Sequence, residues 1–308
     1  MNMKKILLLF VLIILSATVG FSLASNNFWE NKDSEKGQPL IKKPILRFAL
    51  VSDSEGENEL LAKALEQAKG KGVNFIVGLG DWSTVGTLDQ LADTKKVFDN
   101  SKLEYFVTAG DHDLWASRER QEDSLTNFRQ VFGESSTMIE RENVLFVILD
   151  NSDIYKGISN EDWEIFSKSV SQWIRKPENQ KTSGSESESP DHWNTNSPTY
   201  RITDTPKLTF VFAHKTPFHP ESKHVMGEGS RQVAKQAQNL LALLENSKVD
   251  GFFSGDLHFF AQFKSSDEAV KITTIGAVAS ERNFQGPRFA IVTVWEDYSW
   301  EVEDVEIR

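Results

Sequence analysis

Short hydrophobic segments rich in Val, Ile and Phe recur along the chain. They cover residues 45–51, 73–79, 103–109, 144–149, 208–213 and 249–254. Runs of this length with little polar alternation are typical of strands that are buried on both faces of a sheet. The pattern therefore predicts core strands distributed over most of the chain.

Segments with the spacing of amphipathic helices separate most of these strands. They cover residues 57–71, 88–100, 121–132, 160–174 and 230–244. The alternation indicates an α/β fold in which helices cover a sheet. Near the C-terminus, residues 269–277, 288–295 and 300–307 are strand-like without helices between them. This tail predicts a second set of antiparallel pairs, and hence two packed sheets.

The N-terminus has the order of features found in a secretory signal peptide. Lys4 and Lys5 precede an apolar run over residues 6–15, and small residues follow up to Ala24. We expect residues 1–24 to be a signal peptide cleaved after Ala24. The alternative is an uncleaved membrane anchor, because apolar or small residues continue as far as Leu23. Either outcome makes the domain extracytoplasmic, secreted or anchored at the outer face.

Two polar segments border or interrupt the expected domain, which covers residues 44–308. Residues 25–43 have the composition of a linker. Residues 177–206 are dominated by Ser, Thr, Asn, Glu and Pro, and such a segment buries too little apolar surface to offset the entropy of ordering it. We expect an exposed, disordered insertion inside the domain, because strand-like sequence resumes at Leu208.

The composition excludes several kinds of partner and site. The net charge of −11 argues against a surface for nucleic acid or anionic membranes, so we expect membrane contact only through the N-terminal segment. The chain has no cysteine, which excludes a disulfide framework, a thiolate nucleophile and cysteine-based metal sites. Any metal must be held by Asp, Glu, Asn or His, and oxygen-rich ligation favours Mn, Mg or Fe, with Zn also possible.

Acidic residues and histidines follow the ends of five predicted strands. They are Asp53 and Glu55; Asp81; Asp111, His112 and Asp113; His214; and Asp256 and His258. Taken singly, such an Asp is most often a helix cap or turn residue, and a lone His is more often a hydrogen-bonded core residue. Ligands of α/β sheets, however, bind beyond the carboxyl ends of the strands. Three of the six histidines lie at strand ends, and the joint pattern predicts a metal cluster.

The order of these turns resembles the calcineurin-like metallophosphoesterase family from about residue 45 to residue 294. The matching motifs are the D-x-H-type turn at residues 53–55, G-D at 80–81, the G-N-H-D-type turn at 110–113, a lone histidine at 214 and the G-H-x-H-type turn at 255–258. The resemblance implies a four-layer α/β/β/α sandwich of two packed mixed β-sheets flanked by helices. It also implies a hydrolase that cleaves phosphoesters with two divalent metal ions.

The resemblance assigns a role to each position. Asp53, Glu55, Asp81 and His258 would hold one metal, and Asp81 would bridge to a second metal held by Asp111, His214 and Asp256. A water between the metals would attack the phosphorus without a covalent enzyme intermediate. His112 would be the catalytic general acid beside the leaving group, and not a ligand.

Three positions depart from the family pattern. Glu55 and Asp256 stand where the family has His, and Asp111 stands where it has Asn. All three can still bind a cation through oxygen, but the predicted ligands now carry five carboxylates. A more negative site should favour hard metals and attract a phosphate dianion less strongly. We therefore expect reduced or specialised activity.

Several further residues have open roles. Asp113 would either orient His112 or act as a structural cap, and Thr84 stands three residues after Asp81 where some relatives have a second acidic residue. Seven other residues would either contact the substrate or have an ordinary structural role. They are His219, His224, Trp82, Trp115, Arg118, Arg120 and Arg282. His192 falls in the insertion and is expected to be solvated.

The sequence thus predicts an exported, monomeric, metal-dependent phosphoesterase that acts on a phosphorylated small molecule or envelope component, as a monoester or a diester. One alternative is a metal-binding or scaffold protein of the same fold with weakened or lost catalysis. Another is a metal-dependent hydrolase of a different ester. No Gly-x-Ser-x-Gly motif for a serine nucleophile is present.

Overall fold

The computed structural model describes residues 42–174 and 206–308. Within them, residues 44–308 belong to one compact unit. The expected signal segment at residues 1–24, the linker apart from its last two residues, and the insertion at 177–206 apart from Pro206 lie outside the described residues. Those three predictions stay predictions.

The first five elements alternate between strand and helix. They are β1 (Pro44–Val51), α2 (Asn58–Gly70), β2 (Phe75–Gly78), α3 (Leu88–Ser101) and β3 (Glu104–Val107). The three strands pair in parallel, with β1 beside β2 and β2 beside β3. Their carboxyl ends therefore meet at one edge of the sheet.

The middle of the chain is more irregular. It contains the 3₁₀ turn η1 (His112–Leu114), α4 (Trp115–Glu119), α5 (Thr126–Phe132), β4 (Thr137–Arg141), β5 (Val144–Ile148) and α6 (Asn160–Ile174). The last third contains β6 (Leu208–Ala213), α7 (Arg231–Asn246), β7 (Gly251–Ser254), β8 (Ala261–Lys264), β9 (Lys271–Thr274), β10 (Arg288–Trp295) and β11 (Trp300–Glu306).

The strands form two mixed sheets. The first has the order β11-β10-β1-β2-β3, and the second has the order β4-β5-β6-β7-β9-β8. The central strands β5, β6, β7 and β9 of the second sheet run parallel. The pairs β1·β10, β10·β11, β4·β5 and β8·β9 are antiparallel.

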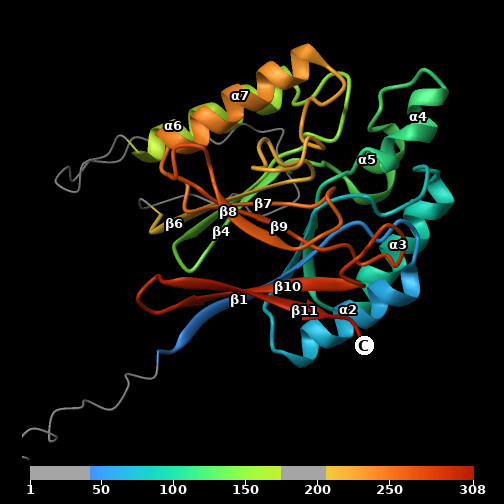
Figure 1. The fold of residues 1–308 in the computed structure, drawn as a ribbon. Helices are drawn as coiled ribbons and strands as arrows, with labels where there is room; N and C mark the ends of the chain where they lie inside the picture. The colour runs from blue at the N-terminus through green and yellow to red at the C-terminus, as the bar shows by residue number, and fades with distance from the viewer. Residues whose placement is uncertain (1–41, 175–205) are drawn as a thin grey trace, which may run out of the picture. The chain divides into compact units, whose positions relative to one another are not determined.

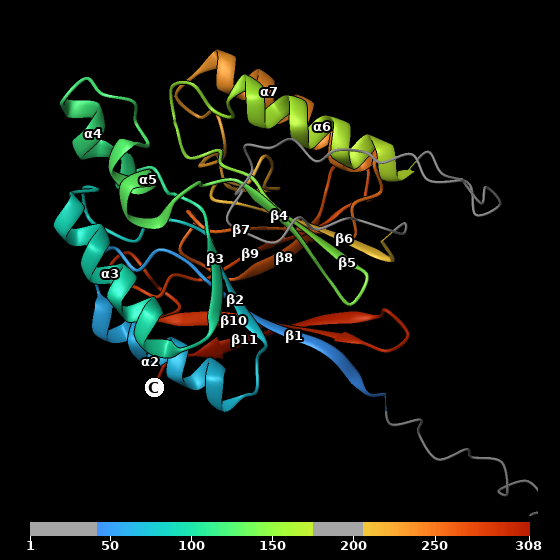
Figure 2. The same ribbon diagram turned by 180° about the vertical axis from the view of Figure 1, so that it is seen from behind.

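The sheets and helices stack in four layers (Figures 1 and 2). Helices α6 and α7 cover the outer face of the second sheet, and α2 and α3 cover the outer face of the first. Three hydrophobic clusters lie between successive layers. The four-layer α/β/β/α sandwich of two packed mixed sheets is confirmed.

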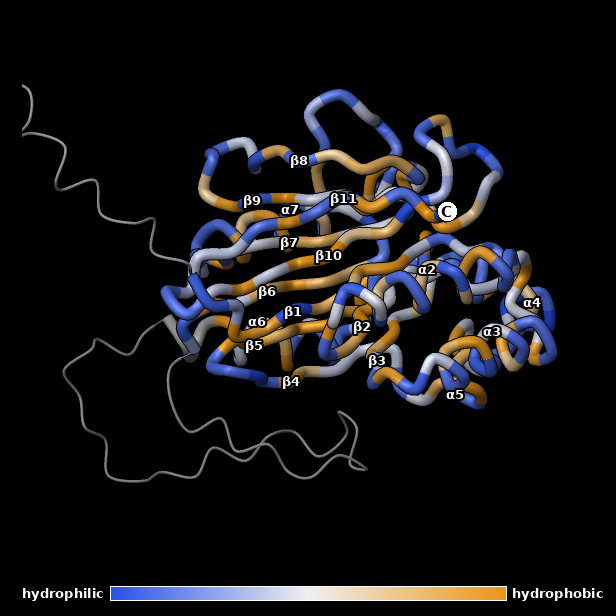
Figure 3. The backbone as a smooth tube through the Cα atoms, turned by 90° about the horizontal axis from the view of Figure 1, so that it is seen from below, coloured by the Kyte–Doolittle hydropathy of each residue, from blue (hydrophilic) through white to orange (hydrophobic). Residues whose placement is uncertain are grey.

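Strand β1 shows how the sequence produces this layering. Its side chains alternate between the two faces of the sheet, as the pleat requires. Phe48 and Leu50 enter the cluster between the sheets, whereas Ala49 and Val51 enter the cluster beneath α2 and α3. Both faces are buried from Phe48 to Val51, which explains why this half of the strand is apolar without alternation. The hydrophobic centres of the strands are visible in Figure 3.

Aromatic rings fill the space between the two sheets. Phe48 packs edge-on against Phe146 with ring centroids 5.0 Å apart, and Phe212 stacks on Phe253 at 5.2 Å. Edge-to-face and offset pairs of this kind contribute beyond their buried area. This core holds the carboxyl ends of the two sets of parallel strands in a fixed relation.

Two details of the predicted secondary structure are wrong. The helix predicted for residues 121–132 covers only α5, because Gln121 has a left-handed backbone (φ 60°) and the turn after it precedes the helix. The C-terminal strands do not form a set of their own: β9 joins the second sheet beside β7, whereas β10 and β11 extend the first sheet. Strands β4 and β8 were not predicted, since both are short edge strands with partly polar sequences.

None of the helices formed by residues 42–174 and 206–308 has the length and hydrophobicity needed to cross a membrane.

Candidate metal centre

Five strand ends deliver the predicted site residues to one place. Asp53, Asp81 and Asp111 follow β1, β2 and β3 of the first sheet, and His214 and Asp256 follow β6 and β7 of the second. Backbone hydrogen bonds tie these turns together: the Asp53 N–H donates to the carbonyl of Gly80 at 2.9 Å, and the Gly255 N–H donates to that of His214 at 3.0 Å. The site therefore lies where the two sheets meet.

The backbone of this centre is unusual. Five of its non-glycine residues have left-handed φ angles: Asp53 (52°), Glu55 (44°), Asp81 (57°), Asp256 (65°) and His258 (58°). Such conformations cost on the order of 1–3 kcal/mol each, and they cluster at functional sites whose surroundings force them. The strain directs several acidic and histidine side chains toward a common point.

Glycines allow the close approach of the turns. A Cβ on Gly110 would lie 2.0 Å from Asp81 Oδ1, and one on Gly255 would lie 1.9 Å from Ser52 Oγ. A larger residue at Gly110 would collide with the Asp81 backbone nitrogen at 2.2 Å, and one at Gly255 would displace the Ser52 side chain. The glycines of the G-N-H-D-type and G-H-x-H-type turns are thus packing requirements of the site.

The structure brings the ligands predicted for the first metal together. His258 Nε2 lies 3.3 Å from Glu55 Oε1 and 4.0 Å from Asp53 Oδ1. Ligand atoms of Asp53 and Asp81 lie within 4.8 Å of each other and of one from His214, which was predicted for the second metal. Among the described residues, the buried atoms His258 Nδ1 of the first set and Asp256 Oδ2 of the second set have no hydrogen-bond partner. This donor set of carboxylates and imidazole fits a divalent cation.

The ligands predicted for the second metal also converge, but around a lysine. His214 Nε2 lies 3.3 Å from Asp111 Oδ1 and 3.6 Å from Asp256 Oδ1. Lys215 Nζ lies 2.9 Å from the same atom of Asp111 and 2.5 Å from the same atom of Asp256. A cationic side chain is therefore already present between the two carboxylates. Ligand atoms of Asp111, His214 and Asp256 lie within 4.8 Å of one another, which by distance suits a metal ion, but the Lys215 ammonium already contacts the same two carboxylate oxygens.

Lys215 was not predicted as a site residue. The sequence contained a signal for it, because Lys215 directly follows His214 and the substitutions at Asp111 and Asp256 add negative charge that needs a counterion. Burial by itself lowers the pKa of Lys215, but the carboxylates of Asp256 and Asp111 outweigh this effect and raise it above its usual value. The side chain is therefore an ammonium at neutral pH.

His214 is oriented by a backbone carbonyl. Its Nδ1 donates to the carbonyl of Leu79 at 2.7 Å, which directs Nε2 toward Asp81, Asp111 and Asp256. Burial opposes the charged imidazolium, but Asp81, together with the other two carboxylates, raises the pKa of His214 well above its usual value. Burial in turn raises the pKa of Asp81.

His112 lies at the edge of this cluster. Its Nδ1 donates to the carbonyl of Thr84 at 2.9 Å, so the main chain of Thr84 performs the orienting role for which the sequence offered no acidic residue. A ring nitrogen of His112 lies within 4.8 Å of the carboxylates of Glu55 and Asp81. Its ring stacks on Trp115 with centroids 4.4 Å apart, so Trp115 borders the site.

Asp113 is a structural cap and does not orient His112. Its buried carboxylate accepts hydrogen bonds from the backbone N–H groups of Trp82 (3.0 Å), Ser83 (3.0 Å) and Gly110 (2.9 Å). The Ser83 hydroxyl donates a fourth bond at 2.7 Å. These bonds join the turns after β2 and β3. Trp82 is fully buried and packs in the core.

Replacing Asp113 with Ala should destabilise the fold. Three buried N–H groups would lose their acceptor, and the cost of each unsatisfied group suggests a loss of about 3 kcal/mol or more in the free energy of unfolding. Urea denaturation of both proteins measures the difference. Asp93→Ala, on the exposed face of α3, is the matched control and should change stability little; an equal effect of both substitutions would contradict the assigned role.

The remaining candidates have different surroundings. His219 Nδ1 accepts from the N–H groups of Glu221 and Ser222 and packs on Phe263, and it is a loop-ordering residue. Two other candidates reach the predicted ligands. Arg282 pairs with Glu55, and His224 Nε2 lies 3.4 Å from Asp256 Oδ1.

The two other arginines form local contacts away from the predicted ligands. Arg118 lies over the Tyr155 ring, and Arg120 pairs with Glu122. His192 lies outside the described residues.

His224 should make stability depend on pH. Its hydrogen bond to Asp256 raises its pKa to about 9, against the opposing effect of burial. The charged form is favoured in the folded state, so the stabilisation is complete below the ordinary pKa of 6.5 and is lost as the pH rises through about 9. Because the side chain is 55% exposed, the effect should be about 1 kcal/mol or less.

The measurement is the free energy of unfolding at pH 6 and pH 10 in the presence of a chelator. The wild type should lose more stability over this range than His224→Gln. An identical pH dependence in both proteins would show that His224 does not pair with Asp256 in the folded state.

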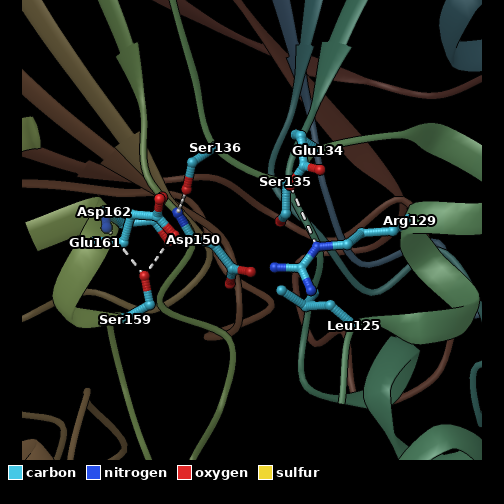
Figure 4. Close-up of a pocket in the computed structure, with 9 residues that line it drawn as sticks. All are labelled: Leu125, Arg129, Glu134, Ser135, Ser136, Asp150, Ser159, Glu161 and Asp162. Atoms are coloured by element: carbon cyan, nitrogen blue, oxygen red, sulfur yellow. Dashed lines mark hydrogen bonds and ion pairs between the residues drawn. The ribbon is translucent and has the colours of Figure 1, made fainter. Parts of the chain in front are cut away.

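A separate small cavity of about 40 Å³ lies between α5 and α6 (Figure 4). It is lined by acidic, hydroxyl and arginine side chains, none of which belongs to the predicted site. Its polar groups bond to one another: the Asp150 N–H donates to Ser136 Oγ at 2.9 Å, and the Ser159 hydroxyl donates to Asp162 at 2.8 Å. The side chains that line this cavity link the regions around α5 and α6, and the cavity is not part of the metal centre.

Comparison with known proteins agrees with this geometry. The sequence profile of a family described as calcineurin-like phosphoesterase matches residues 46–260. The chain belongs to the calcineurin-like phosphoesterase family. Family and fold together support a metal-dependent phosphoesterase that uses divalent metal ions. A search of curated proteins gave no significant match.

Solved structures share the calcineurin-like fold at low sequence identity. A dimetal phosphatase from Danio rerio aligns with 16% identity and a TM-score of 0.51 over 86% of this chain and 100% of its own. A purple acid phosphatase from yellow lupin aligns with 12% identity and a TM-score of 0.56 over 85% of this chain and 51% of its own. GAP50 of Plasmodium aligns with 14% identity and a TM-score of 0.51 over 86% and 90%.

Proposed function

We propose that this chain is an exported phosphoesterase that hydrolyses a phosphomonoester or phosphodiester with His112 as the general acid. The observation that carries the proposal is the position of His112, whose ring nitrogen lies within 4.8 Å of the candidate ligands Glu55 and Asp81. A residue needed only for folding would not require a partly exposed imidazole at the border of a metal centre.

Asp53, Glu55, Asp81 and His258 would hold the essential ion. A divalent ion bound there would lower the pKa of a water molecule and neutralise phosphate oxygens. The protein residues supply the rest: Asp81 also accepts the backbone N–H of His112 at 3.0 Å. This bond sets the distance between the ion-binding carboxylate and the acid.

His112 is suited to protonate a leaving oxygen. The hydrogen bond to the carbonyl of Thr84 places a proton on Nδ1, so in the imidazolium form Nε2 carries the transferable proton. Stacking on Trp115 fixes the plane of the ring. General acid catalysis of this kind contributes roughly 10²–10³ in rate.

The surroundings of the site favour a phosphorylated small molecule or envelope component over a nucleic acid. Two cationic side chains at the rim, Arg282 and His224, contact candidate ligands and have exposed portions that can meet a phosphate. The overall charge of −11 disfavours a long polyanion. We propose that the enzyme acts as a monomer outside the cytoplasm.

The test is an assay of the purified full-length protein with p-nitrophenyl phosphate and bis(p-nitrophenyl) phosphate, each with added Mn²⁺, Mg²⁺, Fe²⁺ or Zn²⁺. Turnover should require a metal and should cease with a chelator. A folded protein without turnover under any of these conditions would overturn the enzymatic proposal. N-terminal sequencing of the protein from its native cells tests export and cleavage after Ala24.

A second candidate is a metal-binding scaffold without catalysis. The observation that favours it is the pairing of Asp111 and Asp256 with Lys215, which removes two carboxylates from a second ion. The same fold occurs in GAP50, described as the anchor in the inner membrane complex of Plasmodium. Metal binding without turnover in the assay above would support this candidate.

A further inference from the structure

We propose that the Lys215 ammonium replaces the second metal ion, so that the chain binds one divalent ion, at the position of Asp53 and His258. The inference rests on the proposed function, because it assumes that the same centre binds a divalent ion. It changes the site from a pair of ions to one ion and one fixed ammonium group.

The ammonium and a second ion would compete for the same atoms. Lys215 Nζ contacts Asp256 Oδ1 at 2.5 Å and Asp111 Oδ1 at 2.9 Å. These are also the carboxylate oxygens that face His214 Nε2. An ion held by the three residues would need both oxygens at about 2.0–2.2 Å. The space between those oxygens and the imidazole is the space that Nζ borders, so ion and ammonium exclude each other.

Lys215 is held in place by its main chain as well as by its charge. Its N–H donates to Asn151 Oδ1 at 2.9 Å, and its carbonyl accepts from Asn151 Nδ2 at 2.7 Å. Asn151 is buried, and only 6% of the Lys215 side chain is exposed. The ammonium cannot turn into solvent without leaving two largely buried carboxylates unpaired, which is strongly unfavourable.

The first position has a different cation at its border. Arg282 pairs with Glu55, but 61% of the Arg282 side chain is exposed. Only Glu55 is largely buried in this pair, at 10% exposed, and the exposed guanidinium can turn into water, so the pair opens at less cost than one with both partners buried. An ion can therefore displace Arg282 from Glu55, whereas it cannot displace Lys215 from Asp111 and Asp256. This contrast selects the first position for the single ion.

A site with one ion and the Lys215 ammonium accounts for the carboxylates at positions 111 and 256 together. Asp111 and Asp256 stand where the family pattern has Asn and His, and both new carboxylates contact the one buried lysine of the centre. An ammonium has three donors, and these two contacts leave one for a phosphate oxygen. Lys215 would thus take over part of the charge neutralisation that a second ion provides.

The experiment measures bound Mn²⁺ per chain in the full-length protein by elemental analysis after removal of all metal and reloading. The wild type should hold one ion, and electron paramagnetic resonance should show isolated Mn²⁺. Lys215→Met should hold two ions with an exchange-coupled spectrum. The triple variant Lys215→Met, Asp111→Ala, Asp256→Ala should return to one ion, because neither position then offers a ligand atom. Lys223→Met, an exposed lysine of the following loop, is the matched control and should hold one.

Two ions in the wild type, or one ion in a folded Lys215→Met protein, would overturn the inference and leave the phosphoesterase proposal standing. No bound ion in any of the proteins would contradict both. If Lys215→Met does not fold, anomalous scattering from crystals of the Mn²⁺-loaded wild type decides: one peak beside Asp53 and His258 is expected, and a second peak beside His214 would overturn the inference.

Discussion

Replacing His112 with Ala should lower kcat for an alkyl phosphoester, whose alkoxide leaving group needs a proton, by roughly 10²–10³ while the protein keeps its bound ion. The imidazole is placed to donate a proton to the leaving group, and its Nδ1 bond to Thr84 concerns only orientation. The predicted ion position has Asp53, Glu55, Asp81 and His258 as ligands and does not need His112. Steady-state kinetics and elemental analysis of the same sample give the two quantities.

The control for this substitution is His219→Ala. His219 also packs on an aromatic ring, Phe263, but its partners are backbone N–H groups of its own loop. The kcat of the His219→Ala protein should stay close to that of the wild type. A substrate with a better leaving group should also recover much of the activity of His112→Ala, because it needs less protonation. Loss of the ion together with activity in His112→Ala would mean that His112 is a ligand.

Asp81→Asn should abolish activity by removing the ion. Asp81 belongs to two of the groups of ligand atoms that converge in the site, and its carboxylate is buried between the two sheets. Asn has the same size and can still accept the His112 N–H, so the fold should persist. Changing residues that only support a metal ligand costs 10–100-fold in affinity, and loss of this ligand should cost about 100-fold or more.

Equilibrium titration with Mn²⁺ measures that affinity, and circular dichroism checks the fold. Asp89→Asn, in the exposed first turn of α3, is the control of matched chemistry and should bind Mn²⁺ as the wild type does. Unchanged affinity in Asp81→Asn would remove Asp81 from the metal centre.

Much of the fold follows from the sequence pattern. The predominantly apolar strands β1, β5, β6 and β7 are buried on both faces over most of their length, and this burial is what their composition predicts. The pattern does not say which sheet a strand joins, because that choice depends on contacts far apart in sequence. Strand β9 pairs in parallel with β7, and β10 pairs with β1 at the other end of the chain.

The convergence of the site residues was predictable for the same reason. A polar residue directly after an apolar strand lies at the carboxyl edge of a sheet, and Asp53, Asp81 and His214 follow this rule. The details that decide the chemistry were not predictable from residue types. The carbonyl of Thr84 orients His112. Every residue has a main-chain carbonyl, so the residue type at position 84 does not predict this bond.

Lys215 shows a different limit of sequence reasoning. A lysine beside a histidine at a strand end is ordinarily a surface residue, since lysine is almost never fully buried without a partner. From the sequence, the excess of carboxylates was assigned to metal preference and activity and not to a lysine, and only the structure shows that Asn151 holds this lysine inside the site.

The most direct test of the whole account is turnover of the wild-type protein as a function of bound Mn²⁺ per chain. Phosphoesterase activity should be absent from the metal-free protein, rise in proportion to occupancy and level off at one ion per chain. Activity that requires a second ion would contradict the role of Lys215, and a protein that holds its ion but hydrolyses no phosphoester at any occupancy would contradict the account as a whole.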